Sequence, residues 1–287
     1  MELAARPSGF QIWLLAARPR TLPAAVAPVV VGAAAAGMAR PLAAVLALFS
    51  SLFIQIGTNF ANDYSDFKRG ADAERVGPMR VTQSGLVAPG NVKRAAWIAF
   101  GISMLFGLSL AAIAGWPIVV IGAVSIAAGW LYTGGPWPLG YHGLGDLFVL
   151  LFFGLVATCG TAWAVGGTVT REAVLAGFGI GCLATAILVV NNLRDARTDA
   201  KVGKNTLAVR LGPLWTRVEY VTLVVTAFWC AFLISPRGPW ALLALPLAVP
   251  ALRRVLGNEG AALNPGLGET ARLELVYAAL LAVELWR

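Results

Sequence analysis

Apolar stretches of about 20 residues recur along the whole 287-residue chain, and they constrain its fold more than any other feature. A helix of that length crosses the hydrocarbon core of a bilayer. Hydrophobic residues make up 58% of the chain and charged residues only 13%, whereas soluble domains average about 45–50% and about 25%. We therefore predict an all-α, polytopic membrane protein with about nine transmembrane helices. The predicted spans lie near residues 21–39, 42–62, 95–114, 116–133, 143–165, 172–192, 218–235, 239–256 and 270–286.

The segment before the first span, residues 1–20, is predicted to lie at the membrane interface. Trp13 and the arginines Arg18 and Arg20 suit the headgroup region better than the bilayer core. The same arginines and the nearby prolines interrupt the apolar run that a cleavable signal peptide requires. We treat residues 1–287 as one transmembrane domain.

The first cluster of charged residues follows an uncharged run, residues 41–56, and lies in the sequence NFANDYSDFKRGADAERVGPMRVTQSG. Carboxylates at the end of a long apolar helix are costly unless they bind something. Carboxylate oxygens suit a hard cation such as Mg²⁺, which usually shares its shell with substrate phosphates. The neighbouring Lys and Arg side chains suit the phosphates. Four polar residues are spaced i, i+3, i+4 and i+7, on one face of a helix: Asn59, Asn62, Asp63 and Asp66.

A second cluster of the same kind lies in the sequence VVNNLRDARTDAKVGKNTLAVRLG, residues 189–212. Its Asn191, Asp195 and Asp199 again lie on roughly one helical face. Because the two cluster-bearing spans are four helices apart, they run in the same direction and both clusters emerge on one side of the membrane. A single cluster fits a solvated helix end beside a mixed-charge loop. Two copies on one side favour facing carboxylates that hold metal ions on a diphosphate.

The basic residues predict the orientation. All but four of the 22 Lys and Arg residues fall on one side of the nine-span topology. That side holds the N-terminal segment and the loops that contain the two clusters, 63–94 and 193–217. The positive-inside rule then places the N-terminus and both clusters in the cytoplasm, and the C-terminus on the opposite side.

The two clusters also carry a family resemblance that extends over nearly the whole chain. NDYSDFKRGAD and NNLRDARTDAKVGKNTLAVRLG resemble the two aspartate-rich motifs of the UbiA superfamily of intramembrane prenyltransferases. In most of that superfamily the first motif reads NDxxDxxxD, whereas here the third acid, Asp72, falls two residues later. This departure is similar to the MenA branch, the 1,4-dihydroxy-2-naphthoate prenyltransferases. RPRTLPAAVAPVVVG and LNPGLGETARLELVY also resemble that branch.

The resemblance implies roles for individual residues. Nine transmembrane helices would surround a central cavity, which the two motifs cap on the cytoplasmic side. The motif aspartates would hold Mg²⁺ and the diphosphate: Asp63, Asp66, Asp195 and Asp199. Four amides would orient them as hydrogen-bonding neighbours: Asn59, Asn62, Asn191 and Asn192. Five basic residues would contact the diphosphate: Lys68, Arg75, Arg80, Arg194 and Lys204. Asp72 would be a third metal-side carboxylate or would order its loop. Four aromatic residues are candidates to shield an allylic cation, an interfacial or lipid-facing position being the alternative for each: Tyr132, Trp137, Phe148 and Phe152.

The reaction that the resemblance implies is transfer of a polyprenyl group from its diphosphate to 1,4-dihydroxy-2-naphthoate, with loss of CO₂. The product would be demethylmenaquinone, in menaquinone biosynthesis at the inner membrane. The expected partners are the two substrates and the lipid bilayer, with no nucleic acid and no obligate protein partner. Three alternatives stay open: another aromatic acceptor (4-hydroxybenzoate, homogentisate or a chlorin), a transporter of divalent cations or anionic lipids, or a non-catalytic quinone-binding protein. Few mid-span charges disfavour transport.

Overall fold

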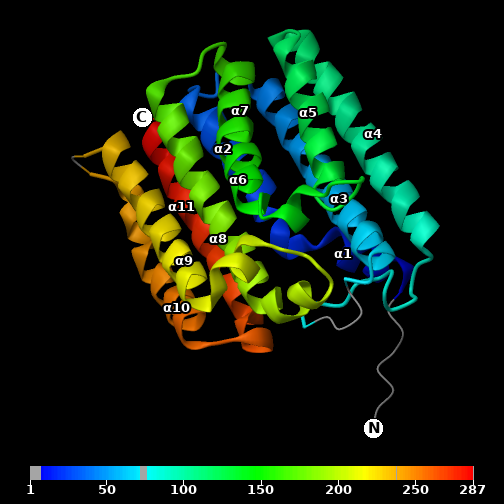
Figure 1. Cartoon of the computed structure of the whole chain (residues 1–287). Helices are drawn as coiled ribbons and strands as arrows, with labels where there is room; N and C mark the ends of the chain where they lie inside the picture. The colour runs from blue at the N-terminus through cyan, green and yellow to red at the C-terminus, as the bar shows by residue number, and fades with distance from the viewer. Residues whose placement is uncertain (1–7, 72–75, 237, 287) are drawn as a thin grey trace.

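A computed structural model of the chain describes residues 8–71, 76–236 and 238–286, and every regular element in these ranges is a helix. The long helices stand side by side, and their connections lie at the two ends of the bundle (Figure 1). The all-α prediction is therefore confirmed. In chain order the helices are α1 (Gly9–Ala17), α2 (Pro23–Ala35), α3 (Pro41–Lys68), α4 (Pro89–Ala114), α5 (Pro117–Leu131), α6 (Gly145–Val149), α7 (Ala157–Gly166), α8 (Arg171–Lys201), α9 (Leu207–Ile234), α10 (Leu245–Gly257) and α11 (Asn264–Leu285).

Six helical stretches among the described residues are long and apolar enough to cross a membrane, and they match six of the predicted spans. A seventh is the bent pair formed by residues 9–21 and α2, whose two parts meet at 54°. The two remaining predicted spans correspond to α5 and α11. Helix α5 has only 15 residues, and α11 carries four charged side chains, among them the fully buried Glu274. The count of nine spans stays a prediction.

Local sequence signals place the helix starts. Proline occupies the first turn of α2, α3, α4 and α5, where its missing N–H leaves no helical hydrogen bond unmade. Thr170 and Thr206 cap α8 and α9, because each hydroxyl accepts a hydrogen bond from a backbone N–H in the first turn. These signals set the first residues of α3 and α8, the helices that carry the two clusters, and of α4 and α9, the helices that follow them.

Two groups of helices share the core. Helix α3 packs mainly on α4, and α8 packs mainly on α9 and on the segment before α7. The largest cluster of buried apolar side chains joins α2, α8, α9, α10 and α11. A smaller one joins α1, α3 and α4 to the loop that contains Val81. Helices α3 and α8 run in the same direction, so their C-terminal ends meet at the lower end of Figure 1.

The span from α6 to α7 contains a π-helical segment, Leu150–Val156. Glycines let this segment approach α8 closely. A Cβ atom on Gly154 would lie 2.5 Å from the carbonyl oxygen of Gly177 and from the Cα of Gly181, so no larger residue fits there. π-Helical turns inside longer helices are frequent at functional sites, and this one places Phe152 and Phe153 in the cavity described below.

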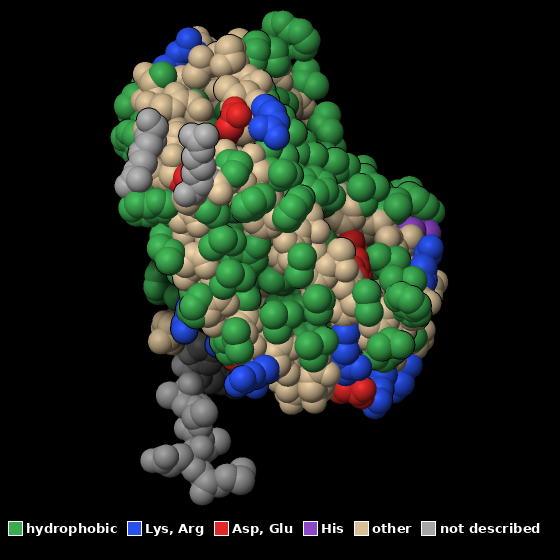
Figure 2. Space-filling view, turned by 90° about the vertical axis from the view of Figure 1, so that its left-hand side faces the viewer, with side chains coloured by type: hydrophobic (Ala, Val, Ile, Leu, Met, Phe, Trp, Pro, Cys, Tyr) green, Lys and Arg blue, Asp and Glu red, His purple; other side chains and the backbone are tan. Residues whose placement is uncertain are grey.

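Both cluster-bearing helices continue past the predicted spans. Helix α3 extends to Lys68 and α8 to Lys201, so all four motif aspartates lie on helices rather than in loops. On the face shown in Figure 2, basic side chains gather mainly at the end of the molecule where these helices finish, and apolar side chains cover the middle. This distribution is that of a helical bundle whose apolar belt lies in a bilayer.

Candidate active site

A cavity of about 850 Å³ opens between the two groups of helices. Along α3 its lining extends from Ala47 to Asp66, a length of about 28 Å at the rise of an α-helix. One end is apolar, and the other, where α3 and α8 finish, is polar. The polar end is lined by Tyr132 and by predicted site residues from both motifs: Asn59, Asn62, Asp66, Arg80, Asn191, Asn192, Arg194 and Lys204.

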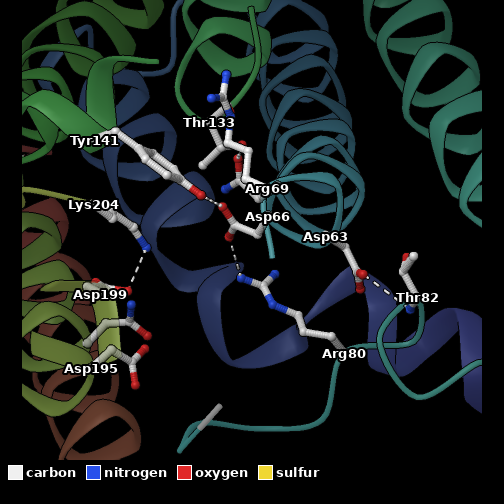
Figure 3. A network of polar contacts seen from close by, with 12 residues as sticks. Asp63, Asp66, Arg69, Arg80, Thr82, Thr133, Tyr141, Asp195, Asp199 and Lys204 are labelled. Carbon is white, nitrogen blue, oxygen red and sulfur yellow. Dashed lines mark hydrogen bonds and ion pairs between the residues drawn. The ribbon is translucent and has the colours of Figure 1, made fainter. Parts of the chain in front are cut away.

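Asp66 is the motif aspartate that lines this cavity from α3. It is 2% exposed. Its Oδ1 accepts a hydrogen bond of 2.9 Å from the phenol of Tyr141, and its Oδ2 pairs with Arg80 Nη2 at 3.1 Å. Figure 3 shows Tyr141 and Arg80 approaching the carboxylate from different sides. Burial and the Asp66 charge raise the pKa of Tyr141 well above its ordinary value, so the phenol stays a donor.

Lys204 brings the second motif to the same place. Its Nζ lies 3.4 Å from Asp199 Oδ1 and 5.6 Å from the centroid of the Tyr141 ring. Burial disfavours the lysine charge, but the charges of Asp66, Asp199 and Asp195 outweigh that effect and raise the pKa of Lys204. Lys204 therefore remains cationic, held between the aspartates of both motifs.

Asp195 is paired with the residue beside it. Arg194 forms two hydrogen bonds to the Asp195 carboxylate, Nε to Oδ1 at 2.8 Å and Nη2 to Oδ2 at 2.6 Å. The same guanidinium donates to Asn191 at 2.7 Å and to Asn264 at 3.1 Å. A Cβ atom on Gly77 would lie 2.5 Å from Arg194 Nη2, so the loop after the first motif packs directly on this group. Arg194 thus joins α8, the start of α11 and the first motif's loop.

Asp63 has its hydrogen-bond partners in the loop after the first motif. Its Oδ2 and Oδ1 accept hydrogen bonds of 3.2 Å from the backbone N–H groups of Val81 and Thr82. It is 1% exposed and, like Asp195 and Asp199, is not among the residues that line the cavity. The sequence predicts Asp63 as a metal ligand, whereas in the structure both of its carboxylate oxygens accept hydrogen bonds from a loop.

The amides of the first motif also have structural partners. Asn59 donates to the carbonyl oxygen of Ala17 at 2.9 Å and to Thr21 Oγ1 at 3.0 Å, which ties α3 to the N-terminal segment. Asn62 accepts a hydrogen bond of 2.7 Å from Thr133 Oγ1. Because both side chains line the cavity as well, they connect its wall to the elements around it.

The remaining predicted residues divide into three groups. Tyr132, Phe148 and Phe152 line the cavity, whereas Trp137 is 53% exposed and stacks on His142. Lys68 is exposed at the end of α3 and lies outside the cavity lining. Asp72 and Arg75 lie outside the described residues.

A divalent cation fits the chemistry of the polar end, provided that a ligand shares its shell. The available donors are carboxylate and amide oxygens, and the buried Oδ2 of Asp199 has no hydrogen-bond partner among the described residues. Within the described ranges, no three Asp, Glu, His or Cys side chains lie close enough to hold a metal by themselves. Mg²⁺ is typically bound by one or two carboxylates together with substrate phosphates. The adjacent Lys204 and Arg80 suit those phosphates.

Comparisons with known proteins identify the relatives of this chain. The family model described as the UbiA prenyltransferase family matches residues 25–257. The chain is 42% identical to 1,4-dihydroxy-2-naphthoate octaprenyltransferase of Mycobacterium tuberculosis over 282 residues, which cover 96% of this chain and 97% of that protein. It is 39% identical to the protein of the same name from Escherichia coli, with 91% of each chain covered.

Solved structures extend the comparison to the fold. A UbiA homologue from Archaeoglobus fulgidus bound to GPP and Mg²⁺ superposes with a TM-score of 0.65, at 17% identity, over 95% of this chain and 99% of that chain. A structure described as digeranylgeranylglyceryl phosphate synthase gives a TM-score of 0.63 at 16% identity, over 96% of this chain and 98% of that chain. At such identities the likeness concerns the fold alone.

Proposed function

The chain belongs to the UbiA prenyltransferase family, and we propose that it transfers a polyprenyl group from its diphosphate to 1,4-dihydroxy-2-naphthoate. The single observation that carries the proposal is the cavity, which joins an apolar corridor to a polar end built from both motifs. An isoprenoid diphosphate has the same two-part character. The names of the similar proteins support the naphthoate as the acceptor over other aromatic rings.

Asp66 from the first motif and Asp195 and Asp199 from the second would supply carboxylates to Mg²⁺ at the polar end, with diphosphate oxygens completing its shell and Asn62 beside them. The metal ion, when bound, neutralises the charge of the departing diphosphate. Lys204 and Arg80 would bind the diphosphate oxygens, since both are buried cations beside the motif carboxylates. When the diphosphate binds at this end, the apolar part of the cavity, the corridor, remains available to the isoprenoid chain.

The aromatic side chains that line the cavity would stabilise positive charge on the allylic carbon as the diphosphate leaves. These are Tyr132, Phe148 and Phe152. The electron-rich ring carbon that bears the carboxyl group then forms the new C–C bond, and the carboxyl group leaves as CO₂. An apolar wall also excludes water, which would otherwise capture the cation.

The proposed location is the cytoplasmic membrane, with the N-terminus and both motifs facing the cytoplasm. The basic residues at the motif end of the bundle support this orientation (Figure 2). The substrates and the bilayer are the proposed partners.

The test is a reaction of the full-length protein in detergent with Mg²⁺, 1,4-dihydroxy-2-naphthoate and a polyprenyl diphosphate, followed by mass spectrometry. We expect a product whose mass is that of the prenylated ring less CO₂. Parallel reactions contain 4-hydroxybenzoate or homogentisate in place of the naphthoate. Product from one of these acceptors and none from the naphthoate would contradict the proposed acceptor.

A further inference from the structure

Asp63 lies on the same helical face as Asn59, Asn62 and Asp66, but it alone among these four is absent from the cavity lining. Figure 3 shows it directed to the loop at Thr82, away from the group formed by Tyr141, Lys204 and Asp199. Both of its oxygens accept backbone hydrogen bonds, each of 3.2 Å, from neighbouring residues of that loop.

We propose that Asp63 is a positioning residue, which holds the loop after the first motif so that Arg80 reaches Asp66, and that it is not a metal ligand. The inference rests on the proposed function only for the role of Asp66 and Arg80. The contact between Asp63 and the loop is independent of any reaction.

The loop also has hydrogen bonds of its own. Ser84 N–H bonds to the Arg80 carbonyl at 3.0 Å, and Val87 N–H bonds to the Val81 carbonyl at 3.2 Å, so the turn closes on itself. Gly85 has φ 72°, a value at which a side chain is unfavourable. The N–H groups of Val81 and Thr82 point the other way, to Asp63. Because both residues are buried, these donors would be left without a partner if the carboxylate were lost.

The position of Arg80 follows from the position of Val81. Val81 is fully buried against α1, α3 and α4, where its side chain packs in the cluster that contains Phe60 and Phe100. Asp63 bonds the Val81 backbone N–H, and Arg80 is the residue before it. One helical turn further along α3, Asp66 accepts the Arg80 side chain at 3.1 Å. Two carboxylates of α3 therefore hold adjacent residues of one loop. Asp63 accepts hydrogen bonds from the loop backbone, and Asp66 binds the Arg80 side chain.

Because Asp63 is directed to the loop and does not line the cavity, binding a metal at the polar end would require the carboxylate to turn and give up both backbone bonds. No other acceptor for the two N–H groups is present among the described hydrogen bonds. Water does not reach the group readily, since Asp63 is 1% and Thr82 3% exposed. Asp66, which lines the cavity, is already placed for the metal.

The first test measures the loop itself. Thr82→Cys introduces a buried thiol, and its labelling by a water-soluble maleimide is compared with the chain that has only its native cysteines. Adding Asp63→Asn should raise the labelling rate about tenfold or more, and Asp63→Ala should raise it further, because alanine retains no acceptor. Asp199→Asn is the matched control, since this carboxylate of the second motif pairs with Lys204 and not with the loop, and it should change the rate little. An unchanged rate in both Asp63 variants would overturn the proposal.

The second test separates positioning from metal binding. Asp63→Asn should lower kcat, while the Mg²⁺ concentration that gives half the maximal rate stays within about threefold of the parent, and Asp66→Asn should raise that concentration about tenfold or more. Thr82→Pro removes one of the two N–H groups and leaves every carboxylate in place. It should reproduce the behaviour of Asp63→Asn. A normal rate in Thr82→Pro, with a raised Mg²⁺ requirement in Asp63→Asn, would assign Asp63 to the metal. The labelling result stands even if the naphthoate reaction fails.

Discussion

Tyr141 donates a hydrogen bond of 2.9 Å to Asp66, and this bond joins a glycine-rich loop between α5 and α6 to the first aspartate motif. The ring of the same tyrosine lies 5.6 Å from Lys204 of the second motif. Because one side chain contacts both motifs, it sets their separation at the polar end of the cavity.

The Tyr141→Phe variant should therefore lose about tenfold in kcat, since it removes one hydrogen bond to a buried carboxylate and leaves the ring. The raised pKa of Tyr141 keeps the phenol protonated, so the loss should be constant from about pH 6 to about pH 9. Tyr277→Phe is the control, because that buried hydroxyl bonds to Ala227 within the other group of helices. A loss that disappears toward low or high pH would contradict the donor role.

Lys204→Ala should raise the KM for the polyprenyl diphosphate more than the KM for the naphthoate, by about tenfold or more. The ammonium group is mostly buried between the aspartates of the two motifs, where a phosphate oxygen would meet it. Lys68→Ala serves as the control, since Lys68 is exposed and outside the cavity lining. An effect confined to the naphthoate would place Lys204 in the acceptor pocket instead.

The pair of Arg194 and Asp195 predicts an effect on stability. Arg194→Ala leaves the Asp195 carboxylate buried without its counter-ion, which typically destabilises a protein by about 3–5 kcal/mol. The apparent unfolding temperature in detergent should fall clearly, and the double variant Arg194→Ala/Asp195→Ala should recover part of the loss. Arg197→Ala is the control, because Arg197 is exposed and should leave the unfolding temperature almost unchanged. Equal effects of Arg194→Ala and Arg197→Ala would contradict the account.

The apolar corridor predicts a limit on chain length. Gly122 lines the cavity, and a Cβ built there meets no atom within 4 Å. Gly122→Leu should therefore fold, fill part of the corridor, and reduce the use of a long polyprenyl diphosphate more than that of geranyl diphosphate. Gly101→Leu is the matched control, since Gly101 is equally unobstructed but exposed on α4 outside the cavity. Equal rates for both chain lengths in Gly122→Leu would show that the chain binds elsewhere.

Periodicity in the sequence predicted much of this site. The spacing from Asn59 to Asp66 places these residues on one helix, and the four-span separation places the two motifs at one end of the bundle. Both features are found in the structure. The low charge predicted a membrane protein, and the apolar stretches of about 20 residues predicted that it is helical.

Other features depend on contacts that spacing does not encode. Tyr141 lies in a Gly- and Pro-rich loop, and no local pattern indicates that the loop folds back on α3. Asp63 shares a helical face with Asp66, yet its hydrogen-bond donors are the backbone N–H groups of residues 81 and 82. Its partners therefore depend on how the loop folds, which the spacing of the aspartates does not indicate. Arg194 pairs with the adjacent Asp195, although neighbours in a helix usually point apart. The count of nine spans stays a prediction, because α5 is short and α11 carries charged residues such as Glu274 inside the bundle.

The most direct test of the central claim, that aspartates from both motifs serve one metal–diphosphate site, is the rate of prenyl transfer by Asp66→Asn, Asp199→Asn and the double variant. Each amide keeps the shape of the side chain and removes its charge. The account predicts that each single variant loses about 10²-fold or more in kcat, and that the double variant loses little beyond the worse single variant. Near-parental rates in both single variants would contradict it.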